Sequence, residues 1–176
     1  MTPHHRAPAE PLVDFATLYS DHAADVHRFA LYLSGDPALA DDLVSETFVR
    51  VWTARDRVEL TTVRGYLFAI VRNLFLQDLR RQRRRAPLDE AVASNQPGPD
   101  VRASGHSSLR AVLAALALLP EVDRAAVLMR ADEGLPYEEI AAALGITVSA
   151  AKVKVHRARL KLAEMLEPAA NKERRP

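Results

Sequence analysis

The chain has 176 residues, of which 48 % are apolar and 6 % aromatic, and its formal net charge is +1. This length allows one domain or two small ones, and the shortage of aromatic residues favours packed helices over a sheet. The absence of cysteine excludes disulfides, thiolate zinc sites and a cysteine nucleophile. No apolar run approaches the roughly 20 residues that cross a bilayer, and the polar residues 1–11 do not form a secretion signal. We therefore expect a cytoplasmic protein without membrane insertion.

The first predicted helices lie between residues 12 and 52. Apolar residues at three- and four-residue spacing predict a helix over 12–34 that Gly35 ends in a left-handed conformation. Asp36 offers a cap for a second helix, with Pro37 at its first position and its end near Trp52. The residues that this pattern assigns to the core are Phe15, Leu18, Tyr19, Val26, Phe29, Leu33, Leu39, Leu43, Phe48, Val51 and Trp52.

A third helix follows the polar residues 55–62 and carries Val63, Leu67, Ile70 and Leu74 on one stripe. It is expected to continue into the arginine run at 80–85. Residues 86–106 then contain three prolines, two glycines and no aromatic residue. Such a composition cannot bury enough apolar surface to order itself, so it predicts a flexible linker between two domains.

The second domain is expected to be helical throughout. A helix that begins near Leu109 breaks at Pro120, and the next runs from about Glu121 to Ala131. A short helix over 137–144 and a turn at Gly145 precede a last helix over 148–165, which is predicted to stop before Pro168. No strand pattern occurs, so the predicted fold class is all-α: two small helical domains joined by a flexible linker.

The last two of these helices have the form of a helix-turn-helix, whose second helix enters the major groove of DNA. We expect its buried stripe to be Val148, Ala151, Val155, Ala158 and Leu162. Ser149, Lys152, Val153, His156 and Arg157 then face outwards, and they include donors suited to base edges and phosphates. The alternative is a helical hairpin with a basic surface.

The distribution of charge favours the DNA-binding interpretation. Residues 1–79 hold seven basic and eleven acidic side chains, whereas 80–85 add five arginines and no acid. Residues 148–161 hold five more basic side chains, again without an acid, while acidic residues stand just before the motif. A single charge run is usually a solvated surface. Two separate runs at the ends of helical patterns are typical of a nucleic-acid binder.

These motifs resemble the extracytoplasmic-function (ECF, group IV) sigma factors of bacterial RNA polymerase. Leu119–Pro120, GLPYEEIAAALGI and AKVKVHRAR are similar to region four of that family, and ADDLVSETFVRVW and RGYLFAIVRN are similar to region two. The resemblance implies region two at 12–85, a linker at 86–106 and region four at 107–167. Three positions depart from the usual pattern: Tyr66 replaces a tryptophan, Gln77 replaces an aspartate, and Val153 stands where a serine is usual. Val153 can offer only apolar contact, for instance to a thymine methyl group.

The resemblance also implies a role for each exposed group of residues. Polymerase binding would fall to Asp41, Asp42, Glu46 and Phe48 of the second helix. Downstream promoter DNA would meet Arg64, Arg72, Asn73, Arg80 and Arg81, and residues 55–62 would lie where an unstacked base is captured. Upstream promoter DNA would meet Ser149, Lys152, Val153, Lys154, His156, Arg157 and Arg159.

The expected function is therefore transcription initiation with core RNA polymerase and promoter DNA as partners, in response to a stress or envelope signal. The resemblance further implies an anti-sigma partner. We expect no catalytic residue, cofactor, metal or small-molecule substrate, because His22 and His27 do not share a helical face and no glycine-rich phosphate loop is present. Two alternatives stay open: a stand-alone helix-turn-helix regulator with an effector or dimerisation domain, and a protein whose first domain only binds another protein.

Overall fold

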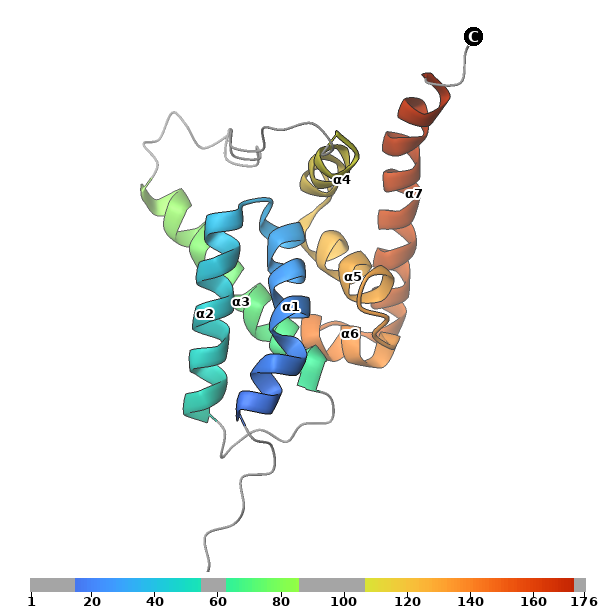
Figure 1. Cartoon of the computed structure of the whole chain (residues 1–176). Helices are drawn as coiled ribbons and strands as arrows, with labels where there is room; N and C mark the ends of the chain where they lie inside the picture. Colours follow the sequence, from blue (N-terminus) through green and yellow to red (C-terminus); the bar gives the residue numbers. More distant parts are fainter. Residues whose placement is uncertain (1–14, 55–62, 86–106, 173–176) are drawn as a thin grey trace, which may run out of the picture.

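A computed structural model describes residues 15–54, 63–85 and 107–172 of the chain (Figure 1). Every regular element in these ranges is an α-helix, as the sequence predicts. The helices are α1 (Phe15–Ser34), α2 (Pro37–Ala54), α3 (Val63–Arg85), α4 (Ser107–Ala117), α5 (Glu121–Ala131), α6 (Tyr137–Leu144) and α7 (Val148–Lys172). The expected linker at 86–106 and the base-capturing segment at 55–62 lie outside the described residues.

Helices α1, α2 and α3 pack together as the N-terminal bundle. Gly35 ends α1 with φ of 72°, in the left-handed conformation that a glycine adopts without steric cost. The Asp36 carboxylate then accepts hydrogen bonds from the backbone N–H groups of Ala38 at 2.9 Å and Leu39 at 3.2 Å, which caps α2. Both boundary predictions are confirmed, and this tight turn fixes α2 beside α1.

Helices α4 to α7 form the C-terminal bundle, in which α7 packs against α4, α5 and α6. Apolar side chains of α5 and α6, including Met129 and Ile140, are fully buried. On α7 the buried side chains are Ala151, Val155 and Ala158, with Val148 and Leu162 partly buried, so the predicted stripe is confirmed.

The two bundles lie directly against each other in the described part of the chain. Helix α1 contacts α4 and α5, and α3 contacts α6, so that one apolar core continues from one bundle into the other. Figure 1 shows α1 and α3 lying between α2 on one side and α5 and α6 on the other. The polar groups along this boundary therefore need partners from the opposite bundle.

Three expectations, one each about α1, α2 and α7, need correction. Trp52 was expected in the core, but its exposed fraction is 49 %, and Tyr19 on α1 is 47 % exposed, because both lie at the edge where α1 and α2 meet. Helix α7 was expected to end before Pro168, yet it continues to Lys172. A proline removes one backbone hydrogen bond from a helix and so weakens it without always ending it.

Candidate polymerase and promoter-DNA interfaces

Helices α6 and α7 meet in the predicted helix-turn-helix geometry. Gly145 ends α6 with φ of 66°, and its N–H bonds back to the carbonyl groups of Ala141 and Ala142. The hydroxyl oxygen of Thr147 accepts a hydrogen bond from the N–H of Ala150 at 3.1 Å, which caps the start of α7. The turn and the cap together fix which side of α7 is buried and which side faces outwards.

The outward side of α7 presents a row of donors with one apolar side chain among them. The exposed residues are Ser149, Lys152, Val153, His156, Arg157 and Arg159. The ammonium group of Lys152 lies 5.7 Å from the centre of the Tyr137 ring, which holds it beside the turn. Val153 is 54 % exposed at the middle of the row. Hydrogen-bond donors and an apolar side chain on one convex face are the groups that read base edges in a groove.

Lys154 lies on the side of α7 that faces α5. Its ammonium group is 3.2 Å from the carboxylate of Asp123 on α5, and Arg157 reaches the same carboxylate at 4.0 Å. Asp123 is only 1 % exposed, so its charge requires these partners. In this arrangement Lys154 joins α7 to α5, while Arg157 retains an exposed side chain.

Helix α2 carries the predicted acidic surface on its outer side. Asp41, Asp42 and Glu46 are exposed, together with Ser45. Asp41 lies 3.0 Å from the ring of His27, and Glu46 pairs with Arg50 one turn later at 2.9 Å. These exposed pairs leave the carboxylates accessible to a basic partner.

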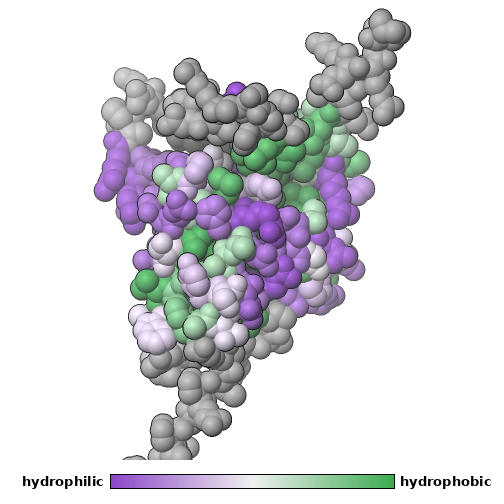
Figure 2. Space-filling view, viewed as in Figure 1, coloured by the Kyte–Doolittle hydropathy of each residue, from purple (hydrophilic) through white to green (hydrophobic). Residues whose placement is uncertain are grey.

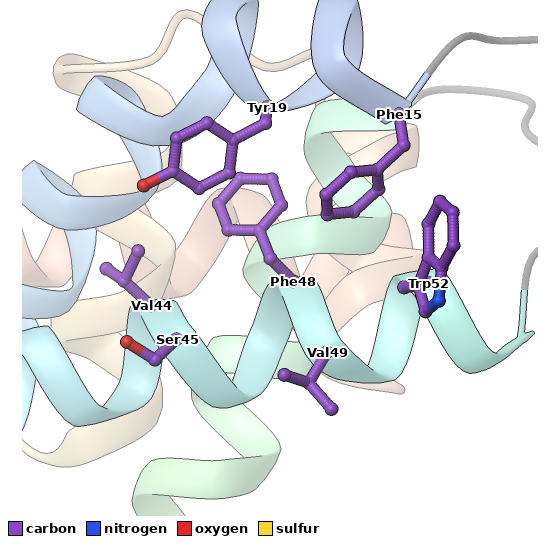
Figure 3. A pocket seen from close by; sticks show the side chains of 7 residues that line it. All are labelled: Phe15, Tyr19, Val44, Ser45, Phe48, Val49 and Trp52. Carbon is purple, nitrogen blue, oxygen red and sulfur yellow. The ribbon is translucent and has the colours of Figure 1, made fainter.

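Phe48, predicted to bind polymerase, is only 3 % exposed and packs inside the N-terminal bundle. It forms the floor of an aromatic groove between α1 and α2, lined by Phe15, Tyr19, Val44, Ser45, Phe48, Val49 and Trp52 (Figure 3). The Tyr19 and Phe48 rings are 4.7 Å apart, and the rings of Phe15 and Trp52 are 4.9 Å apart. The groove has a volume of about 420 Å³ and borders the acidic surface of α2. Phe48 thus shapes this groove from below.

The five predicted downstream-DNA residues of α3 fall into two groups. Asn73, Arg80 and Arg81 are exposed. Arg72 instead donates two hydrogen bonds to the Glu121 carboxylate of α5, from Nε at 2.6 Å and from Nη2 at 2.9 Å. Only 12 % of the Arg72 side chain is exposed. Arg72, like Arg64 nearer the start of α3, therefore lies at the boundary between the bundles.

Sequence reasoning missed a charged cluster at this boundary, the inter-bundle cluster of Asp25, Arg28, Arg64, Asp132 and Glu133. The Glu133 side chain is fully buried and accepts hydrogen bonds from Arg28 at 2.7 Å and from Arg64 at 2.5 Å. Arg28 also donates to Asp132 at 2.6 Å. Figure 2 shows hydrophilic side chains gathered where α1 meets α5 and α6. Residues of α1 and α3 are thus tied to the segment between α5 and α6.

Burial and pairing shift the pKa values in this cluster. Burial raises the pKa of the Glu133 carboxyl above its ordinary value, Asp132 adds to the rise, and hydrogen bonds from Arg28 and Arg64 oppose it. The pKa of Arg28 is raised, chiefly by its hydrogen bond to Asp132. Arg28 therefore stays charged, and the hydrogen bonds that Arg28 and Arg64 donate to the buried Glu133 carboxyl group hold the cluster together.

A second contact between the bundles involves Arg124 of α5. Its Nη1 donates a hydrogen bond to the Leu33 carbonyl group near the end of α1 at 2.7 Å. Arg124 is 4 % exposed, and burial lowers its pKa. No local sequence pattern could indicate this contact, because its two residues are 91 positions apart.

Two other kinds of site were sought in the described ranges. They contain no group of three or more acidic or histidine side chains that could hold a metal ion. No helix among them is long and apolar enough to cross a membrane.

Comparison with known proteins assigns each bundle to a protein family. Residues 18–85 match the Sigma-70 region 2 family, and residues 109–162 match Sigma-70, region 4. The chain is 39 % identical over 155 residues to the ECF RNA polymerase sigma factor SigE of Mycolicibacterium smegmatis, covering 85 % of this chain and 60 % of that protein. It is 37 % identical to the ECF RNA polymerase sigma factor EcfG of Rhodopseudomonas palustris, covering 89 % of this chain and 87 % of that one.

A solved structure agrees with these matches. The sigma factor RpoE of Bartonella quintana, crystallised with the anti-sigma factor NepR, superposes with a TM-score of 0.76 at 27 % identity. The superposition covers 88 % of this chain and 97 % of that one. The matched residues include the acidic surface of α2, the arginines of α3 and the outward side of α7. The chain belongs to the extracytoplasmic-function family of RNA polymerase sigma factors.

Proposed function

We propose that this chain is a group IV sigma factor of the cytoplasm, which joins core RNA polymerase and directs it to specific promoters in response to a stress or envelope signal. The observation that carries the proposal is the outward side of α7, where six residues are exposed and none of them is acidic. That surface lies on the second helix of a helix-turn-helix whose buried stripe is complete. Catalysis then belongs to the polymerase.

Each bundle would have its own part in this function. We assign region two to residues 12–85 and region four to residues 107–167, joined by a flexible linker at 86–106. Asp41, Asp42 and Glu46 on α2 would dock on a basic surface of the polymerase, because exposed carboxylates steer association with such a surface. The aromatic groove beside them would contribute apolar area, with Phe48 supporting its floor.

Promoter DNA would be contacted at two places. Lys152, Val153 and His156 in the first turns of α7 are positioned for base edges of the upstream element, and Arg159 further along for phosphate. On α3 the exposed Asn73, Arg80 and Arg81 would contact the downstream element, as would Arg64 and Arg72 once released from their carboxylate partners. An anti-sigma factor would bind the chain until the signal arrives, as NepR binds its sigma factor.

The direct test is transcription in vitro. Core polymerase with the purified chain should initiate at promoters that core polymerase alone does not use. The charge-reversed variant D42K/E46K, which keeps α7 intact, is the matched control and should fail to initiate. Sequence-specific binding of duplex DNA by the chain alone, with no effect on the polymerase, would instead support a stand-alone regulator.

A further inference from the structure

Lys152 and Lys154 are close neighbours on α7 but differ in what holds their ammonium groups. Lys154 is paired with the carboxylate of Asp123 at 3.2 Å. Lys152 is exposed, and no ion pair among the residues that the structure describes includes it. Its ammonium group lies instead 5.7 Å from the centre of the Tyr137 ring. Lys152 is therefore restrained by a neutral partner and keeps its charge for a ligand.

The ring of Tyr137 has little freedom to move. Tyr137 is the first residue of α6 and packs, partly buried, against the apolar core. The guanidinium group of Arg130 on α5 lies 4.8 Å from the centre of the same ring. Arg130 is held in turn, because its Nη1 donates a hydrogen bond to the Leu135 carbonyl group at 2.9 Å. The ring is thus fixed by α5 and by the core before any DNA is bound.

A fixed ring next to a lysine changes how that lysine binds. An unrestrained lysine on a helix surface samples many rotamers, and this freedom is lost when its ammonium group binds one acceptor. A ring that already attracts the ammonium group reduces that loss for the orientation it favours. The contact does not use up the N–H donors of the ammonium group, which can still bond to a base edge.

We propose that Tyr137, which lies outside the recognition helix, is a positioning residue for the upstream promoter element, because its ring directs Lys152 toward the base pairs that Lys152 reads. The inference rests on the proposed function, since it takes Lys152 to be a base contact. Tyr137 acts through Lys152 and has no effect on the base pairs that His156 reads. Lysine donates to O6 and N7 of guanine, so the positions governed in this way should prefer guanine.

The test is selection of promoters from a randomised upstream element by holoenzyme that contains each variant of the full chain. K152A identifies the base pairs that Lys152 reads. Y137L removes the ring, and Y137F removes only the hydroxyl group. The matched control is Y32L, the same substitution at a partly buried tyrosine of α1 that has no proposed role in binding.

The expected effects are specific to position. K152A should relax the preference at one or two base pairs. Y137L should lower the preference at these same base pairs by about two- to fivefold, as expected for an exposed cation–π contact, and leave the other positions unchanged. Y137L/K152A should equal K152A alone, because the ring acts only through the ammonium group. Y137F and Y32L should keep every preference.

Other roles of Tyr137 give different results. If its hydroxyl group bound a phosphate, Y137F would weaken all sequences alike. If the ring only stabilised the fold, Y137L would lower binding of every sequence without changing the preference, and Y32L could do the same. Either result overturns the inference, as would losses from Y137L and K152A that add in full.

A measurement on the unmodified chain tests the contact itself. Protons above an aromatic ring resonate upfield, so the ε-methylene protons of Lys152 should lie upfield of those of Lys154 in the NMR spectrum, with K152R identifying the signal. Unshifted Lys152 protons would overturn the inference even if Y137L failed to fold. Y137M, which fills the space with a flexible side chain, would then replace Y137L in the selection. Failure of the proposed function looks different: holoenzyme with the unmodified chain would select no upstream element, whatever the NMR spectrum shows.

Discussion

The two helices proposed to contact promoter DNA present their cations differently. On α7 the cations assigned to base edges and phosphates face outwards, and Lys154, which faces α5, is paired with Asp123. On α3 the exposed residues are found toward the arginine run, whereas Arg64 and Arg72 pair with carboxylates of the other bundle. Residue type alone therefore does not tell whether an arginine is available to DNA.

The difference follows from where each helix lies. Helix α7 packs on α4, α5 and α6 and keeps one side open, so its apolar stripe separates a buried side from a solvated one. Helix α3 contacts α1 and α2 on one side and α6 on another. A cation on α3 near that second contact needs an anionic partner, since burying an unpaired charge is costly.

The largest expected effect concerns a third surface, the acidic side of α2, which is open like α7. The variant D42K/E46K should weaken capture of core polymerase by about 2 kcal/mol or more if these carboxylates meet basic groups. Its helicity and melting should hardly change, because exposed charges usually shift the free energy of unfolding by less than about 0.5 kcal/mol. Pull-down with core polymerase measures the first quantity and thermal unfolding the second. Undiminished capture would show that this surface is not the docking site.

Arg72 and Asn73 offer a sharper comparison, because they are neighbours on α3 with different surroundings. R72A leaves the half-buried Glu121 without its partner and should lower the free energy of unfolding by about 1–3 kcal/mol. N73A changes an exposed side chain and should stay within about 0.5 kcal/mol. Denaturant unfolding of both variants provides the measurement. Equal stability of the two variants would mean that the Arg72–Glu121 pair contributes little to holding the bundles together.

The smallest effect is expected for an ion pair that faces solvent. Arg50 and Glu46 lie one turn apart on α2 at 2.9 Å, and both side chains are more than a third exposed. Such pairs contribute about 0.3–0.5 kcal/mol, so R50A should barely alter unfolding in the same denaturant series. If R50A lowered the free energy of unfolding as much as R72A does, surface ion pairs and pairs at the bundle boundary would not differ in their contribution to stability.

Much of the fold could be predicted because its signals are local. Asp36 and Gly35 sit beside the helix ends that they define, and the stripe of α7 repeats every three or four residues. The outward residues of α7 followed from that same periodicity, whereas Lys154 was assigned to DNA by the family resemblance alone. Its partner Asp123 lies 31 positions earlier, so the helical pattern of α7 alone contains no sign of it.

The packing of the bundles could not be predicted in the same way. Arg28 and Glu133 are 105 positions apart, so no local sequence pattern connects them. Trp52 shows a related difficulty. A helical stripe predicts which side of a helix faces the core, but not where along the helix that side stops contacting other helices. Only the placement of α1 and α3 against α5 and α6 shows which of these charged side chains form ion pairs between the bundles.

The account's central claim is that the outward side of α7 reads the upstream promoter element. Selection of promoters from a randomised upstream element, with holoenzyme containing each α7 variant, tests it most directly. K152A or H156A should cost about 1–3 kcal/mol on the preferred element and relax the preference at one or two base pairs. R159A should weaken all sequences alike and reduce the salt dependence by about one unit of slope. Unchanged preference in the K152A and H156A variants would contradict the claim.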